Sequence, residues 1–349
     1  MPVPLPVRML RVSDRHMNEM ENNLWNGRFV PAAIEGWHAG AAAVSVRYRG
    51  GHTRAYPKRS FEVASSEGTR HYNAELDDPS MIRNALSFWF LERIGLPSPS
   101  ARHVLLALNG APLGVYLEIE AVDADFFRKR GLRASSLFYA VNDRADFRPA
   151  PRASLLDGYE YRFGGRGGRE RLRGFIAGIH RRRSAADTAA YLSSRLDIDN
   201  YLRWLSGAVL TGNYDGFDQN YAIYQNRTTG RWSMAPWDYE GTWGRNCFGK
   251  PVSADLVEIG GYNSLTRKLL GHAPFKKRYK RMLRALLGTA FTERSLMPRA
   301  EKMHREIAPY MRAEGRARGA YAGFSEELNT IRQYIRDRRA VLLRDLKRL

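Results

Sequence analysis

Cysteine is almost absent from this sequence of 349 residues, which contains Cys247 alone. A single thiol excludes an intrachain disulfide and a structural zinc site rich in thiolates. Long apolar runs are also missing, since no stretch approaches the roughly 18 uncharged residues of a membrane-spanning helix. Three prolines, together with Arg8 and Arg11, interrupt residues 1–15 before any apolar run reaches the length of a signal peptide. The sequence therefore favours a cytoplasmic protein with no membrane partner.

Acidic residues are scarce relative to basic ones, with 36 Asp and Glu against 56 Lys and Arg, which gives a net charge of +20. The excess is regional, because residues 267–349 alone contain 22 basic and 8 acidic side chains. Such a tail can attract nucleic acid, an acidic protein or a polyanionic assembly, and it can equally be a solvated helical surface. Apolar residues make up 44% of the chain, which is enough for one large two-lobed unit or two domains.

The first third of the chain has the patterns of two hairpins with a helix between them. Residues 44–49 and 58–64 alternate in polarity and flank GGHTRAYP, which predicts a hairpin with a long glycine loop. Apolar residues at helical spacing predict a helix near 80–94. Residues 103–120 hold Asn109-Gly110 between two β-type runs, which indicates a second hairpin.

The remainder is predicted to be mainly helical, at 123–133, 197–213 and from Leu265 onward, with one short hairpin between residues 220 and 237. Residues 142–183 are rich in Arg and Gly and are interpreted as the least regular part. An Arg-Gly stretch can bind RNA. A solvated loop is the favoured interpretation for one copy of the pattern.

Acidic residues gather in NYDGFDQNY (213–221) and in WDYE (237–240), against the trend of the chain. Residues 211–246 contain four acidic and three basic side chains. A local pool of carboxylates suits a hard divalent cation, because Mg²⁺ binds one or two carboxylates together with phosphate oxygens. These two segments therefore predict a magnesium site.

The spacing of Asp215 and Asn220 matches the Asp and Asn of the kinase pattern H-R-D-x-x-x-x-N, and Asp238 follows one hairpin later. In phosphoryl transfer, one Asp accepts the hydroxyl proton, an Asn and a further Asp hold the metal, and a lysine offsets phosphate charge. The alternative is that Asp215 belongs to a simple turn and that Asp238 caps a loop.

The upstream glycine loop supplies groups that suit phosphate. Glycines let backbone N–H groups approach phosphate oxygens closely, and Lys58 begins the strand that follows. Arginines lie on or beside the same loop, at Arg47, Arg49 and Arg54. Taken alone, Gly50-Gly51 is an ordinary hairpin turn. The phosphate interpretation depends on partnership with the downstream acids.

Four ordered motifs resemble those of the CotH-type kinase family of endospore-forming bacteria. They are RYRGGHTRAYPKRSF (47–61), NGAPLGVYLEIEAVD (109–123), NYDGFDQNY (213–221) and PWDYEGTWG (236–244). The resemblance covers nearly the whole chain, and residues 142–183 are the part without a match.

The resemblance implies an atypical protein kinase of α+β class with a reduced two-lobed fold. A β-rich N-lobe would span residues 1–118 and a mainly helical C-lobe residues 119–349. Such a kinase would use ATP and Mg²⁺ to phosphorylate Ser residues of other coat proteins in the cytoplasm of the mother cell, before joining the spore coat. The sequence leaves open whether phosphate or AMP is the group transferred.

By the same resemblance, Asp215 is the catalytic Asp, Asp238 a metal ligand and Lys58 the conserved lysine. Glu120 matches a recurring family position, where it would pair with Lys58, touch the nucleotide or be structural. The nucleotide-binding set is then expected to be Arg49, Gly50, Gly51, Lys58 and Glu120, with Asn220 and Asp238 as metal ligands.

Two other functions are compatible with the sequence. A catalytically inactive coat protein would keep the fold and use its basic surface as an assembly scaffold. Nucleic-acid binding through the arginines of 162–183 is the least favoured, because no recognised binding motif accompanies the charge.

Overall fold

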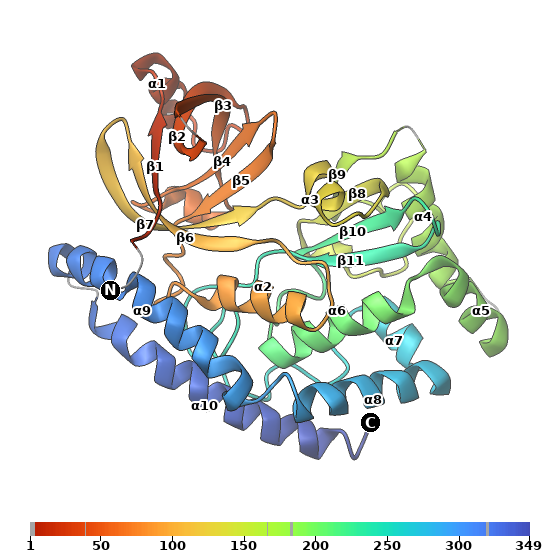
Figure 1. Cartoon of the computed structure of the whole chain (residues 1–349). Coiled ribbons are helices and arrows are strands. Elements are labelled where there is room, and N and C mark those ends of the chain that lie inside the picture. The colour runs from red at the N-terminus through yellow and green to blue at the C-terminus, as the bar shows by residue number, and fades with distance from the viewer. Residues whose placement is uncertain (1–3, 39, 166, 182–183, 319–320) are drawn as a thin grey trace.

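The N-terminal part of the chain folds into a closed β-barrel, seen at the upper left of the computed structural model in Figure 1. The structure describes residues 4–38, 40–165, 167–181, 184–318 and 321–349. Neighbouring strands follow the order β1-β2-β3-β4-β5-β7-β6, and parallel pairing of β1 with β6 closes the barrel. The strands are β1 (Val7–Arg11), β2 (Val30–His38), β3 (Gly40–Arg49), β4 (Ser60–Ser65), β5 (Gly68–Asn73), β6 (Ala101–Leu108) and β7 (Ala111–Glu120).

Both hairpins predicted in this region are confirmed. β3 pairs with β4 in antiparallel register, and β6 pairs with β7. Asn109 and Gly110 have φ values of 50° and 85°, as the tight turn between β6 and β7 requires. The β-rich lobe was predicted, but its closure into a barrel was not. Closure depends on the pairing of β1 with β6, which lies about a hundred residues later in the chain.

The glycine loop between β3 and β4 contains a 3₁₀ turn at His52–Ala55. Gly50 has a φ of 107°, and a Cβ atom there would lie 2.2 Å from Oγ1 of Thr53. A side chain at this position would therefore be strained twice, by its backbone conformation and by this contact.

A second, four-stranded sheet lies beside the barrel, in the order β11-β10-β8-β9. Its strands are β8 (Ala134–Ala140), β9 (Tyr159–Phe163), β10 (Tyr221–Asn226) and β11 (Trp232–Pro236). Helices cover its lower face in Figure 1, and the largest buried cluster lies between them and the sheet. Trp204 and Trp232 are among its fully buried side chains. A smaller core fills the barrel.

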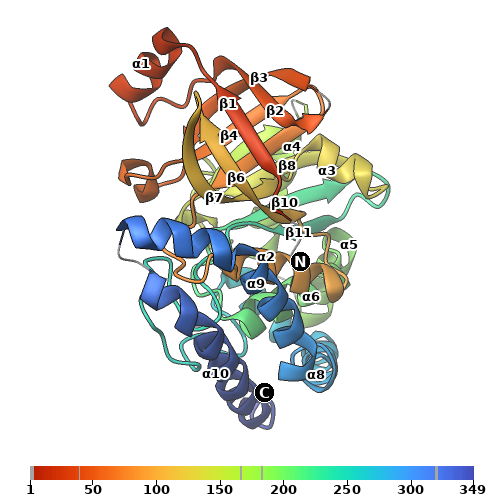
Figure 2. The same cartoon turned by 60° about the vertical axis from the view of Figure 1, so that its left-hand side comes forward.

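The C-terminal region is mainly helical, as expected. The α-helices of the described chain, of which α1 and α2 belong to its N-terminal part, are α1 (Asp14–Asn22), α2 (Arg83–Arg93), α3 (Ala124–Lys129), α4 (Gly168–Ile179), α5 (Ala185–Arg195), α6 (Ile198–Thr211), α7 (Ser264–Leu270), α8 (Ala273–Gly288), α9 (Glu293–Arg318) and α10 (Tyr321–Asp345). Figure 2 shows α9 passing beneath β6 and β7. Among the described helices, none combines the length and the apolar character that crossing a bilayer requires.

The prediction that residues 142–183 are irregular is wrong in its second half. β9 and α4 form there, because Leu172, Phe175, Ile176 and Ile179 make a buried helical stripe among the arginines. Residues 166 and 182–183, three of the arginines in this stretch, lie outside the described part of the chain.

A buried ion network ties the barrel-proximal helix α2 to the C-terminal helix α10. The guanidinium of Arg83 lies 2.6 Å from a carboxylate oxygen of Asp78 and 2.6 Å from one of Glu327, and its Nε donates to the carbonyl of Thr242. Arg245 donates to the same Glu327. These bonds fix the segment that follows β11, where the predicted metal ligand Asp238 lies.

Candidate functional site

Alternate residues of β3, β4 and β5 form one wall of a cavity of about 510 Å³ between the barrel and the sheet. Tyr48, Phe61 and Tyr72 point into the barrel core, so their neighbours point outward. The outward residues that line the cavity are Arg47, Arg49, Ser60, Glu62, His71 and Asn73. Strand register places Arg47 opposite Glu62, and Arg49 opposite Ser60. This wall is rich in guanidinium groups.

The basic wall is electrostatically crowded. Burial, followed by the charges of Arg47 and Arg49, lowers the pKa of Arg54. Burial and then Arg49 keep the pKa of His71 well below its ordinary value, so this imidazole is neutral. Arg49 donates to the side-chain oxygen of Asn73, and Arg54 Nε donates to the carbonyl of Gly50 at 2.7 Å. An anion entering the cavity would relieve this repulsion.

Three strand ends form the opposite wall. Tyr221 at the start of β10 pairs with Pro236 at the end of β11 and with Ala140 at the end of β8. The residues just beyond those ends, Asn220 and Asp238, are thereby brought together. Both have a φ of 57°, a left-handed conformation that is uncommon outside glycine and recurs at functional sites.

Asp215 lies beside these strand ends. Asn220 Nδ2 donates to Asp215 Oδ2 at 3.0 Å, which leaves the Asn220 side-chain oxygen available to a cation. Burial, followed by the charge of Asp238, raises the pKa of Asp215 to about 7. The five-residue spacing seen in the sequence therefore corresponds to a direct contact.

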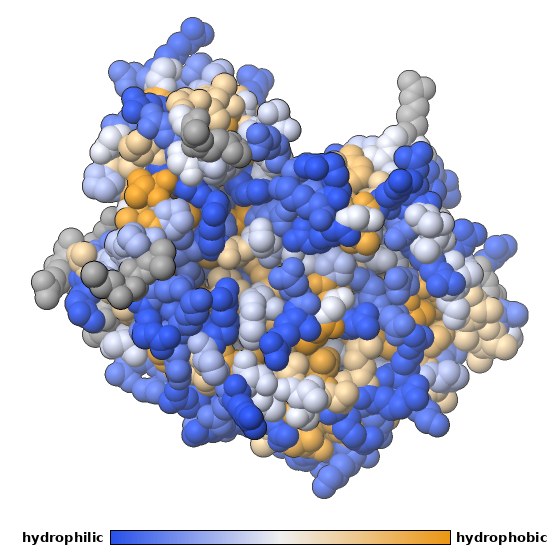
Figure 3. Space-filling view, in the orientation of Figure 1, coloured by the Kyte–Doolittle hydropathy of each residue, from blue (hydrophilic) through white to orange (hydrophobic). Residues whose placement is uncertain are grey.

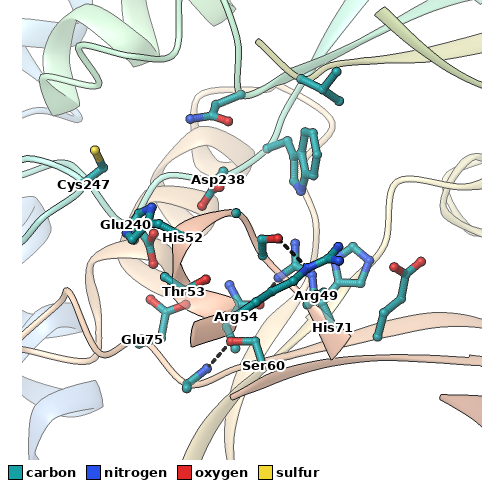
Figure 4. Close-up of a pocket in the computed structure, with 18 of the residues that line it drawn as sticks. Arg49, His52, Thr53, Arg54, Ser60, His71, Glu75, Asp238, Glu240 and Cys247 are labelled. Atoms are coloured by element: carbon teal, nitrogen blue, oxygen red, sulfur yellow. Dashed lines mark hydrogen bonds between the residues drawn. The ribbon is translucent and has the colours of Figure 1, made fainter. Parts of the chain in front are cut away.

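Further carboxylates extend the acidic wall. Figure 4 shows Glu75, Asp238 and Glu240 on the side of the cavity opposite Arg49. Burial raises the pKa of Asp238. Burial, with the charges of Asp238 and Glu75, raises the pKa of Glu240 well above its ordinary value. In the space-filling view of Figure 3, a notch separates the barrel from the sheet, and hydrophilic side chains gather beside it.

The acidic wall suits a hard cation. Asn220 and Asp238 offer an amide oxygen and a carboxylate, and Mg²⁺ completes such a set with water and phosphate oxygens. Within the described residues, no group of three or more His, Cys, Asp or Glu is arranged to hold a metal ion. The residues fit an ion shared with a phosphate ligand better than a closed protein cage.

Lys58 also lines the cavity, but its ammonium group is turned toward β7 and α9. Nζ donates to the carbonyl of Val115 at 2.6 Å and to Glu314 Oε2 at 3.2 Å, and lies 4.7 Å from the ring centre of Tyr116. Oε1 of Glu314 also accepts from the backbone N–H of Val115. The structure thus brings the backbone of Lys58 to the site and directs its charge to a helix of the C-terminal region.

Glu120 is not among the described residues that line the cavity. Its carboxylate accepts from Arg130 at 2.8 Å and from the backbone N–H of Ser100 at 3.1 Å. Burial opposes ionisation, and the bonds from Arg130 and Ser100 outweigh it, so the pKa of Glu120 is lowered. Of its three proposed roles, these contacts match the structural one.

Several cavity residues were missed at the level of sequence. Tyr139 lies near the end of β8 and Trp237 directly follows β11, at the same strand ends that position Asn220. Their ring centres are 4.4 Å apart. Arg162 lies over the Tyr139 ring at 4.8 Å. Glu240 was visible in the WDYE motif without an assigned role. Glu75 follows β5 and gave no sequence signal, because its burial depends on α2 packing against it.

Fold and cavity together define an α+β protein in which a basic β-barrel wall and an acidic strand-end wall face each other. The chain belongs to the CotH family, since the family described as "CotH kinase protein" matches residues 46–342. Inner spore coat protein H of Bacillus subtilis (strain 168) is 35% identical over 347 residues, covering 96% of this chain and 95% of that protein. An inner spore coat protein H-like protein of the same organism is 26% identical, covering 72% and 73%.

Two solved structures are distantly similar. One is the Shewanella oneidensis MR-1 toxin–antitoxin system HipA, HipB with its operator DNA, with a TM-score of 0.35, 13% identity and coverage of 97% of this chain and 74% of that one. The other is the proinflammatory kinase CtkA of Helicobacter pylori, with a TM-score of 0.31, 7% identity and coverage of 81% and 95%.

Proposed function

We propose that this protein is an ATP- and Mg²⁺-dependent protein kinase that phosphorylates Ser residues of other spore coat proteins. One observation carries the proposal: arginines and a glycine loop face a cluster of oxygen ligands across a single cavity. A triphosphate needs both kinds of partner, cationic donors for its oxygens and a divalent ion to share them. Membership of the CotH family supports the same conclusion.

The phosphates are assigned to the barrel wall. Arg49 and Arg54 offer planar guanidinium groups, which bind phosphate oxygens in pairs. Gly50 and Gly51 keep the loop backbone open to close approach. Lys58 stays a predicted phosphate ligand, although in this structure its ammonium bonds to Val115 and Glu314. Glu120 was predicted to bind the nucleotide, but it is not among the described cavity residues and its carboxylate accepts from Arg130, so we assign it no phosphate contact.

The nucleotide base is assigned to the aromatic pair beside the strand ends. Nε1 of Trp237 is buried and has no partner among the described residues. An indole N–H in this state is a donor that suits a ring nitrogen of a purine. Tyr139, itself buried, packs against the Trp237 ring and holds it in position.

The acidic wall is assigned to the metal and to proton transfer. Asn220 and Asp238 would hold Mg²⁺, which when bound offsets the charge on the transferred phosphoryl group. Asp215 would orient the serine hydroxyl and accept its proton. Asn220 Nδ2 holds the Asp215 carboxylate in place.

The setting is inferred from the family. The similar Bacillus proteins are named as inner spore coat proteins. We therefore place the substrates among coat proteins, and the reaction in the mother-cell cytoplasm before the enzyme joins the coat.

Mass spectrometry of one reaction tests the proposal. The purified protein, ATP, Mg²⁺ and a Ser-rich coat protein should yield a substrate heavier by one or more phosphates. Asp215→Asn should yield none, whereas Asp218→Asn should retain transfer, because Asp218 is not among the described cavity residues. A substrate heavier by one AMP would show that the enzyme transfers AMP instead of phosphate. Transfer at the wild-type rate by Asp215→Asn would refute the assignment of Asp215.

A scaffold without turnover is the second candidate, and the engagement of Lys58 by Glu314 is the observation that favours it. Thermal denaturation separates the two. A kinase should be stabilised by ATP with Mg²⁺, as expected for a ligand of the folded state, and should incorporate labelled phosphate. A scaffold should do neither.

A further inference from the structure

A second cavity, of about 770 Å³, lies between α4, α5 and the loop that joins β8 to β9. We refer to it as the arginine groove, after Arg171, Arg181 and Arg195 in its lining. Figure 1 places α4 and α5 at the right-hand end of the molecule, beyond the four-stranded sheet as seen from the barrel. The groove is built largely from residues 142–195, which include the stretch that the family motifs do not cover.

The charge of the arginine groove has one sign. Its described lining contains three arginines and His180 and no Asp or Glu. The main cavity differs, because Glu62, Asp215 and Asp238 face its arginines. Arg181 and Arg195 are exposed, and no hydrogen bond or ion pair joins their guanidinium groups to the described residues. Two cations are therefore available to an anion from solution.

The floor of the groove is rigid and aromatic. Phe175 and Trp232 are buried and stacked, with ring centres 6.0 Å apart and planes at 27°. Arg171 is held by its Nε, which donates to Gln225 Oε1 at 2.7 Å. The Tyr191 hydroxyl donates to the carbonyl of Phe175 at 3.1 Å and fastens α5 to α4. The arginines and this apolar surface line the same cavity.

Two structural elements connect the arginine groove with the main cavity, namely the segment from β8 to β9 and strand β10. Val141, just after β8, and Arg162 of β9 line the main cavity, whereas Pro149 and Leu155 of the loop between these strands line the groove. β10 runs from the metal-site end to Gln225 in the groove. At about 3.4 Å a residue, the five steps from Asn220 to Gln225 cover about 17 Å. Because β10 is buried, a substrate segment that reaches both cavities must pass around the sheet and must be longer than the roughly five extended residues of the direct path.

We infer that the arginine groove binds a phosphoserine-bearing segment of the protein substrate while another serine of the same chain occupies the main cavity. The identity of the anion rests on the proposed function, since phosphoserine is the product of that reaction. Guanidinium groups pair with the oxygens of a phosphate monoester, and the aromatic floor accepts the apolar parts of the neighbouring residues. Each transfer would then create an anchor for the next one.

Peptide binding to the full-length protein without ATP tests the groove separately from the proposed kinase activity. The probes are a Ser-containing peptide and the same peptide with one phosphoserine. The phosphopeptide should bind at least about tenfold more tightly, and Arg181→Gln/Arg195→Gln should abolish the difference. Arg281→Gln/Arg284→Gln, on the exposed surface of α8, removes the same charge elsewhere and should retain it.

Transfer assays add a kinetic signature. On a substrate with several serines, the groove variant should accumulate singly phosphorylated intermediates, whereas the α8 variant should proceed to multiply phosphorylated product. Transfer to a peptide with one serine should be equal in both. Equal loss of phosphopeptide binding in both variants would overturn the proposal, since only net charge would then matter.

The other possible outcomes of these experiments also support or overturn the proposal. Free phosphate that competes as strongly as the phosphopeptide would show that the peptide is not recognised and would overturn the proposal. An oligoribonucleotide bound more tightly than the phosphopeptide would assign the groove to RNA instead. Phosphopeptide binding that persists when Asp215→Asn abolishes transfer would support the groove. Retained binding in a protein that never transfers phosphate would refute the proposed function alone.

Discussion

The two walls of the main cavity are built differently. The basic wall consists mainly of side chains from three paired strands, whose register fixes Arg47 and Arg49, and is completed by Arg54 of the glycine loop. The acidic wall consists of residues just beyond strand ends, where Asn220 and Asp238 adopt left-handed backbone conformations. Paired strands give a stiff surface that suits binding, whereas strand ends bring groups from separate segments to one point. The comparison predicts that the acidic wall governs chemistry and the basic wall governs affinity.

The largest effect is expected at the acidic wall. Asp238→Asn should lower phosphate transfer by about a thousandfold and abolish the Mg²⁺-dependent thermal stabilisation by ATP. Asp215→Asn should lower transfer about as much while keeping that stabilisation, because a general base is not required for binding. Thermal denaturation with and without ATP separates the two variants. Normal transfer in Asp238→Asn would remove this wall from the mechanism.

The basic wall should give a smaller effect that appears in binding. Arg49→Ala should weaken ATP affinity by about 10- to 100-fold, the usual effect of removing a hydrogen bond to a charged group. Transfer at saturating ATP should change less. Arg128→Ala on the exposed surface of α3 is the matched control, and its ATP affinity, measured by calorimetry, should be unchanged. An Arg49→Ala protein with wild-type affinity would refute the division of labour between the walls.

Variants of Lys58 test whether this residue belongs to the basic wall. Since its ammonium bonds to Glu314, both Lys58→Met and Glu314→Gln should lower the free energy of unfolding, by about 1–3 kcal/mol each. The double variant should lose less than the sum of the two, because both remove one contact. Denaturant unfolding measures this coupling. A loss of ATP affinity in Lys58→Met that Glu314→Gln does not share would establish Lys58 as a phosphate ligand.

The smallest effect is expected from Glu75, at the edge of the acidic wall. Burial, followed by the charge of Asp78, raises its pKa from 4.5 to about 8. The folded state therefore binds this proton more tightly than the unfolded state, and stability should fall as pH rises from about 4.5 through 8. Glu75→Gln removes the buried carboxylate and should flatten this decline. Unfolding curves at pH 6 and pH 9 check the sign.

Much of the site was predictable because it is encoded locally. The Asp215–Asn220 spacing, the hairpin that carries Asp238 and the alternation of 44–49 are short-range patterns, and the structure places these residues on one cavity. The family motifs contain the same segments. Local sequence therefore predicted which residues gather at the site.

The features that the sequence did not predict depend on packing between residues far apart in the chain. The direction of the Lys58 ammonium depends on Glu314, more than 250 residues away in the chain, so no local pattern contains it. Glu75 is buried by α2, and Glu120 is drawn to Arg130. The helix α4 was overlooked because its arginines outweigh, in composition, the four apolar residues that pack against the sheet. In each case, the deciding neighbour lies on another element.

The closed barrel limits how another chain can pair with this part of the molecule. A sheet with free margins presents unpaired N–H and C=O groups onto which a neighbouring chain can add a strand. Parallel pairing of β1 with β6 removes such margins from the described barrel. A neighbouring chain therefore finds no open strand margin to extend on the described barrel, so contacts with this part of the molecule have to be made through side chains.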